Sequence, residues 1–155
     1  MSNVIDARLA ELGVTLPPPA TPAANYVPTV QTGNLVYVAG QVPVRDGAFL
    51  YQGKVGADFT VEEGKEAARI VGIGILAQLK QACGGDLDRV VRAVKLNGYV
   101  NCTPDFGHQP HVINGASELM IEVFGEAGRH ARSAVGVTGL PFGVCVEIDG
   151  VFEIR

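Results

Sequence analysis

The sequence predicts a small α+β domain in which two helices pack on one face of a mostly antiparallel sheet. The chain has 155 residues, of which 47% are hydrophobic and 18% charged. These values suit a single compact domain and exclude a disordered one. Segments with apolar residues at helical spacing are interleaved with segments in which apolar and polar residues alternate. Their order, ββ(β)–α–β–α–β–β, predicts a sheet of up to six strands.

The first 25 residues are predicted to stand apart from this domain. Residues 3–12 carry apolar side chains at the spacing of a short amphipathic helix. Pro17, Pro18 and Pro19 follow, and the stretch up to Pro28 is rich in proline and alanine, which favours a stiff, extended linker. We therefore expect a single domain over residues 26–155.

The first half of the domain is predicted to hold two short strands and a long helix. Residues 35–39 and 48–51 are β-prone, and each follows a turn sequence that contains glycine. The helix is predicted from Thr60 to Ala82, because Thr60 and the residue three places later, a glutamate, can form a capping box. Gly72 and Gly74 lie inside this helix, which indicates close packing against a neighbour rather than a dinucleotide-binding loop.

The second half is predicted to begin with a strand over Arg89–Val100, followed by a helix over Pro110–Phe124. In that strand the alternation places Ala93 on the face opposite Leu96. Two further strands, Ala131–Thr138 and Val144–Ile154, flank a Gly- and Pro-containing turn, and we predict that they form a β-hairpin.

Composition also excludes several classes of protein. The formal net charge is −4, which argues against a nucleic-acid-binding surface. No apolar run reaches the ~18 residues of a membrane span, and the N-terminus lacks the apolar core of a secretory signal. Cys83, Cys102 and Cys145 are an odd number of widely spaced cysteines, so we expect free thiols in a reducing cytoplasm.

His108 and His111 form the pair that most resembles a metal site. Cys102 and Asp105 lie nearby in the sequence, and a helical i, i+3 pair can place two imidazoles on one face. Pro110 indicates a helix boundary between them, however, and no third ligand stands at a fixed spacing. We therefore expect loop or helix-cap histidines and no metal. None of the cysteines shows an activating neighbour.

A stronger group of residues lies in the two last strands. Arg132, Ala134 and Gly136 alternate onto one strand face, so that two small residues leave space beside a guanidinium, which can hold a carboxylate with two hydrogen bonds. Glu147 opposes Arg132 if the turn is centred between residues 139 and 140, and lies three residues out of register if it is centred on Pro141. The alternative interpretation is a simple cross-strand ion pair.

Two parts of the chain resemble the reactive-intermediate deaminases, also called the Rid or YjgF family. The resemblance spans about residues 25–155. Its motifs are modest one by one, and their order and spacing make them specific. They are Tyr26-Val27-Pro28, Thr32-Gly33-Asn34-Leu35-Val36-Tyr37-Val38-Ala39-Gly40-Gln41-Val42-Pro43, Ala131-Arg132-Ser133-Ala134, Leu140-Pro141 and Val146-Glu147-Ile148.

The resemblance implies a chorismate-mutase-like α+β fold that assembles as a homotrimer, with ligand sites in clefts between subunits. It also implies cofactor-free hydrolysis of enamines or imines, such as 2-aminoacrylate, to a 2-keto acid and ammonia. Arg132 and the backbone N–H of Ala134 would then bind the substrate carboxylate, and Glu147 would activate the attacking water. Further ligand contacts would fall at Tyr26, Gly40 and Asn114.

The sequence departs from the family at several places, and two other functions stay open. His130 stands where proline is usual, and the segment before Tyr26 and part of the loop between Asn101 and Gln109 are extra. One alternative is a non-catalytic module that binds or senses a 2-keto acid or another carboxylate. The ribonuclease activity attached to the family finds little support, since no stripe of basic and aromatic residues is present.

Overall fold

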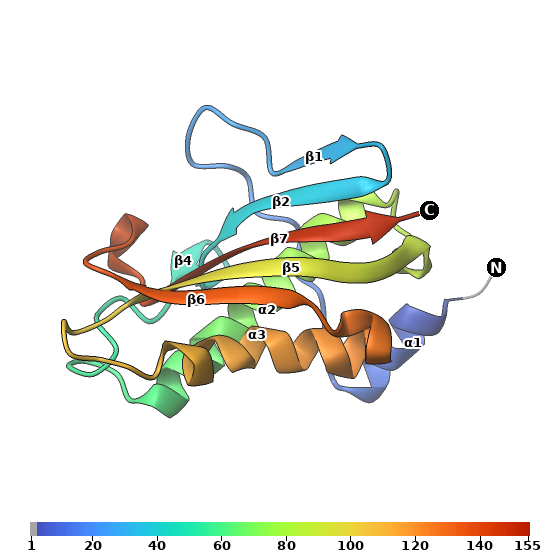
Figure 1. The fold of residues 1–155 in the computed structure, drawn as a ribbon. Helices are drawn as coiled ribbons and strands as arrows, with labels where there is room; N and C mark the ends of the chain where they lie inside the picture. Colours follow the sequence, from blue (N-terminus) through green and yellow to red (C-terminus); the bar gives the residue numbers. More distant parts are fainter. Residues whose placement is uncertain (1–2) are drawn as a thin grey trace.

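The computed structural model describes residues 3–155 and shows a five-stranded mixed sheet beside a small two-stranded one. Strand order in the main sheet is β1-β2-β7-β5-β6 (Figure 1). All neighbours are antiparallel except β5 and β6, which run parallel. The strands are β1 (Thr29–Thr32), β2 (Leu35–Gln41), β5 (Val90–Asn101), β6 (Ala131–Val137) and β7 (Val146–Ile154), with β3 (Val44–Arg45) and β4 (Ala48–Phe49) in the small sheet.

Two long helices, α2 (Val61–Ala82) and α3 (Gln109–Phe124), cover one face of the main sheet (Figure 1). The predicted capping box is present, because the Thr60 hydroxyl accepts the Glu63 N–H and the Glu63 carboxylate accepts the Thr60 N–H. Gly72 brings the helices together, since a Cβ there would lie 3.0 Å from Cδ2 of Leu119. Over residues 3–155, no helix is long and apolar enough to cross a bilayer.

Among residues 3–155, no α-helix covers the opposite face of the sheet. Along β7, buried and half-buried residues alternate without interruption, so that Glu147 and Asp149 point away from the helices. Strand pairing places Val30, Tyr37 and Val135 on the same open face. These three side chains are 54%, 47% and 46% exposed, which leaves an apolar surface facing solvent in the monomer.

The prediction of a six-stranded sheet was wrong, and so was the C-terminal hairpin. β6 pairs with β5 alone, while β7 lies between β2 and β5. The connection contains a short 3₁₀ turn over Pro141–Gly143, in which Phe142 has a φ of 60°. Because β6 and β7 pair with opposite edges of β5, the chain between them passes the end of β5 and does not form a hairpin. Ala93 is also buried, because bulges in β5 shift the alternation there.

The N-terminal helix, α1 (Val4–Glu11), is docked onto the domain. The carboxylate of Asp88 accepts the backbone N–H groups of Val4 and Ile5 at 3.0 and 2.9 Å. It therefore caps a helix that has no side-chain cap of its own. Further on, Nε2 of Gln78 donates to the carbonyl of Ala20 at 2.8 Å, which attaches the proline-rich segment to α2.

Candidate active site

Arg132 reaches from β6 to α3. Its Nη1 donates to Oδ1 of Asn114 at 2.7 Å and to Oγ of Ser117 at 3.2 Å. Both acceptors are neutral, and among residues 3–155 no acidic side chain forms an ion pair with this guanidinium. Partial burial lowers the pKa of Arg132 from its ordinary value, but a guanidinium stays charged in proteins. Since both bonds use Nη1, Nε and Nη2 remain as a planar pair of donors suited to a carboxylate.

Ser117 is itself held by His130. The ring Nδ1 of His130 lies 2.7 Å from the Gly128 carbonyl and therefore carries the proton, which leaves Nε2 to accept from the Ser117 hydroxyl at 2.9 Å. Burial, and secondarily the charge of Arg132, lowers the pKa of His130, so the ring is neutral in this arrangement. The chain of bonds from Gly128 through His130 and Ser117 thus fixes the guanidinium in one orientation.

Glu147 lies beside Gly40 on the open face of the sheet. A side chain at position 40 would collide with Oε1 of Glu147, so glycine is what lets the carboxylate occupy this place. The pairing of β2 with β7 shifts register between Val38 and Gln41, which is where Gly40 stands. Burial, and secondarily the charge of Asp149, raises the pKa of Glu147, which makes this carboxylate a stronger base than an exposed glutamate.

Arg132 and Glu147 do not meet within one protomer. Arg132 pairs with Leu96, which is buried against the helices, whereas Glu147 pairs with Tyr99 on the open face. The two side chains therefore lie on opposite faces of the sheet, two strands apart. The structure brings Arg132 together with Asn114, and Glu147 together with Gly40. The cross-strand contact between Arg132 and Glu147 that a hairpin would allow does not form.

The remaining candidate residues divide between these two groups. Ala134 lies two residues beyond Arg132 along β6 and therefore on the same face. Tyr26 is 50% exposed, and the carbonyl of nearby Pro28 accepts the N–H of Ala39, so this segment runs beside the residue that precedes Gly40. Within one protomer the segment that carries Tyr26 therefore lies nearer in the sheet to Gly40 than to β6.

The rings of His108 and His111 are 5.6 Å apart, centroid to centroid. No group of three or more His, Cys, Asp or Glu side chains over residues 3–155 is arranged to hold a metal ion. All three cysteines are free and buried, and burial raises the pKa of Cys145 to about 12, so that thiol is not a nucleophile at neutral pH.

Ser117 was missed by the sequence reasoning, and His130 was noted only as a departure from the family. Ser117 lies three residues after Asn114 on α3, so the helical repeat puts both side chains on one face. That spacing could have identified Ser117 once Asn114 was a candidate. Nothing local indicates that His130 would reach it.

Comparisons with known proteins agree with this description. Residues 6–148 match the family described as "YjgF/chorismate_mutase-like, putative endoribonuclease". Protein TCP17 of Trypanosoma cruzi is 49% identical over 99% of this chain and 96% of its own length. The crystal structure of protein Atu1372 of Agrobacterium tumefaciens, of unknown function, is 50% identical, with a TM-score of 0.92 over 98% of this chain and 93% of that one.

A "putative endoribonuclease" of Shewanella oneidensis MR-1 is 38% identical, with a TM-score of 0.94 over 98% of this chain and all of that one. These matches confirm the expected chorismate-mutase-like α+β fold and extend across the N-terminal segment. The chain therefore belongs to the YjgF, or Rid, family.

Proposed function

We propose that this protein hydrolyses small enamines or imines that bear a carboxylate, and releases a 2-keto acid and ammonia. The observation that carries the proposal is the fixed, unpaired guanidinium of Arg132. A cation held by two neutral acceptors keeps its charge for a ligand. Asn114 and Ser117 orient it before the ligand arrives, which lowers the entropic cost of binding.

Glu147 supplies the base in this reaction. An imine carbon is already electrophilic, so the step needs a positioned water and a group that takes its proton. The substrate enters as the protonated imine, which an enamine reaches by taking up a proton at its β-carbon. As the water oxygen bonds to the imine carbon, one water proton passes to the Glu147 carboxylate, giving a neutral carbinolamine. That proton then goes to the nitrogen, and the C–N bond breaks as the hydroxyl gives its own proton to Glu147, so that the keto acid forms and ammonia leaves. No metal or cofactor takes part in this proposal.

The site needs two protomers, because Arg132 and Glu147 lie on opposite faces of one sheet. We propose a homotrimer in which the β6 edge of one subunit meets the open face of the next. The exposed Val30, Tyr37 and Val135 support this assembly, since an uncovered apolar sheet face usually marks an interface. Arg132, Asn114 and Ala134 would come from one subunit, and Tyr26, Gly40 and Glu147 from its neighbour.

A coupled assay tests the proposal. A serine or threonine dehydratase would generate the enamine, and release of the keto acid would be followed with and without this protein. We expect wild-type protein to accelerate release, Arg132→Ala to abolish both binding and turnover, and Glu147→Gln to spare binding of a keto acid. Carboxylate binding without turnover in wild-type protein would instead identify a non-catalytic binding module, and cleavage of RNA that depends on Arg132 would point to a ribonuclease.

A further inference from the structure

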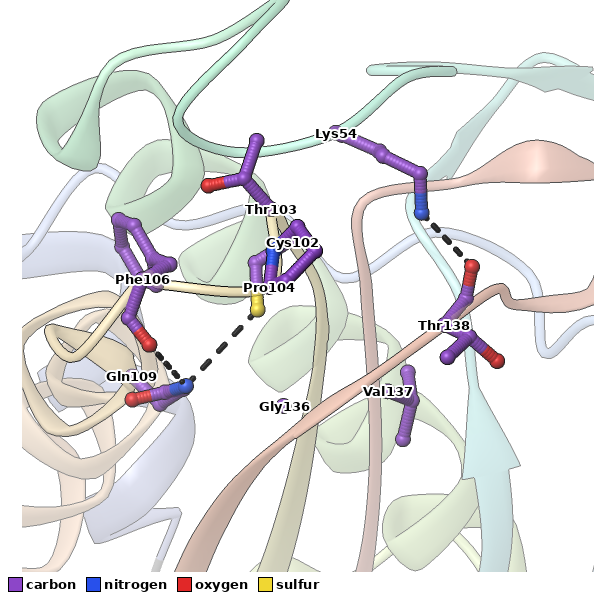
Figure 2. Close-up of a pocket in the computed structure, with 9 residues that line it drawn as sticks. All are labelled: Lys54, Cys102, Thr103, Pro104, Phe106, Gln109, Gly136, Val137 and Thr138. Carbon is purple, nitrogen blue, oxygen red and sulfur yellow. Dashed lines mark hydrogen bonds between the residues drawn. The ribbon is translucent and has the colours of Figure 1, made fainter.

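A pocket of about 610 Å³ lies at the end of β6 that is remote from Arg132. Its walls come from the loop before α2, the loop between β5 and α3, the start of α3 and the end of β6 (Figure 2). The volume falls in the range of small-molecule sites in proteins. The chief lining residues are Lys54, Cys102, Phe106, Gln109, Gly136 and Thr138.

The ammonium of Lys54 is held rigidly at one side of this pocket. Its Nζ donates to Oδ1 of Asn101 at 2.6 Å and to the carbonyl of Thr138 at 2.7 Å. Asn101 is only 4% exposed, and its own amide donates to the carbonyls of Gly53 and Val144, so its oxygen can face only Lys54. The cation is therefore placed by a buried, fully bonded side chain.

Lys54 lacks a counter-ion in the part of the chain that the structure describes. Both acceptors of its ammonium are neutral, and no acidic side chain of residues 3–155 forms an ion pair with it. The carboxylate of Asp58 bonds to the backbone N–H of Lys54 instead of to the ammonium. One of the three ammonium N–H groups is left for a further acceptor.

The other side of the pocket is apolar and aromatic. Figure 2 shows Phe106 and Gln109 across the pocket from Lys54 and Thr138, with Gly136 between them. A Cβ at position 136 would lie 2.8 Å from both Cys102 Sγ and Gln109 Nε2, so glycine lets these two side chains lie against the strand and form the wall. The Gln109 amide nitrogen is occupied by the carbonyl of Phe106, which fixes that wall as well.

We infer that this pocket is a second binding site, for a small carboxylate with an aromatic or branched apolar body. A single free N–H on a point charge suits one carboxylate oxygen, and the space beyond it is lined by Phe106 and other apolar groups. Arg132 and Thr138 are six residues apart on an extended strand, roughly 20 Å. A small substrate bound at Arg132 therefore cannot reach Lys54, so this site is separate from the one proposed for imine hydrolysis and does not depend on it.

An NMR titration of the full-length wild-type protein with sodium benzoate tests the inference. We expect saturable shifts of the backbone amides of Thr103, Phe106, Gln109 and Thr138, and none with benzyl alcohol, which has the same ring but no charge. Arg132→Ala protein should give the same shifts, because that residue is remote. Shifts confined to the start of β6, or equal binding of the alcohol, would overturn the second site and leave the proposed hydrolase untouched.

Substitutions then test the role of the charge. Lys54→Met should weaken benzoate binding at least about tenfold, as expected for loss of a charge-assisted hydrogen bond. Lys54→Arg should keep it. Lys65→Met, the same change on α2 outside the pocket, is the matched control and should bind as wild type does. Should Lys54→Met fail to unfold cooperatively, Phe106→Ala replaces it and should weaken benzoate more than acetate. The site would be refuted if none of these substitutions in the pocket changed the affinity for benzoate.

Discussion

The arrangement of Arg132 and Glu147 predicts that two inactive variants restore each other's activity. Because the residues lie on opposite faces of the sheet, a site shared between subunits takes Arg132 from one subunit and Glu147 from the next. In a cyclic trimer assembled at random from equal amounts of Arg132→Ala and Glu147→Gln chains, each site draws an intact Arg132 with probability one half and an intact Glu147 with the same probability. About one quarter of the sites are then whole.

The assay is keto-acid release after the two variants, carrying different tags, are unfolded together and refolded. We expect about a quarter of the wild-type rate from the mixture, and only background from either variant refolded alone. Mixing the separately folded variants without unfolding controls for slow exchange of subunits. A refolded mixture that stays at background, although both tags co-purify, would show that sites are not shared in this way.

Four further predictions rest on single contacts. Ser117→Ala leaves the Arg132 guanidinium with one acceptor. Steady-state kinetics should then show KM raised about fivefold at constant kcat, which corresponds to about 1 kcal/mol of lost binding free energy. A fall in kcat alone would contradict a positioning role. Gly40→Ala should lower both Tm and turnover in the otherwise wild-type protein, and should leave Tm unchanged in a Glu147→Ala background. An equal loss of Tm in the two backgrounds would mean that the two residues are uncoupled. Burial raises the pKa of Glu147 and so disfavours its ionised form in the folded state. Glu147→Gln should therefore raise Tm at pH 7.5, and this gain should vanish below the unfolded pKa of about 4.3. A gain in Tm that persists at pH 3 would point to another cause. Asp88→Ala removes the cap of α1 and should lower the free energy of unfolding, measured in urea, by about 1–2 kcal/mol. Proteolysis before residue 25 should also become faster. Unchanged proteolysis would show that the helix docks without this carboxylate.

Local chemistry was enough to predict the helices and most of the buried faces. The capping box at Thr60 depends on a residue three places away, and it was confirmed. The close approach of α2 to α3 at Gly72 depends on one packed helix, and it was confirmed too. Apolar and polar residues also alternate along β7 in the sequence, and its buried residues follow that alternation. These features follow from short-range periodicity, which a single sequence displays directly.

The choice of strand partner could not be predicted in the same way. Alternation assigns each side chain to a face, but it does not say which strand lies alongside. β6 and β7 are neighbours in sequence and look like a hairpin, yet β5 separates them. The supposed contact between Arg132 and Glu147 does not form for this reason. The hydrogen bond of Arg132 to Asn114 was not predicted, although both residues were candidates for ligand contacts. Lys54 was missed because its pocket joins four segments that are far apart in the chain.

The capping of α1 by Asp88 also brings the start of α1 close to Arg155. The carboxylate of Asp88 binds the backbone of Val4 and Ile5, while its carbonyl accepts a hydrogen bond from Nη2 of Arg155 at 2.9 Å. Figure 1 shows α1 and the C-terminus on the same side of the molecule. A short glycine-rich linker could therefore join them, and new ends could be opened at the exposed turn between β3 and β4. Such a circular permutant would present both of its ends beside the two-stranded sheet, away from Asp88, and would offer a different place to attach a tag.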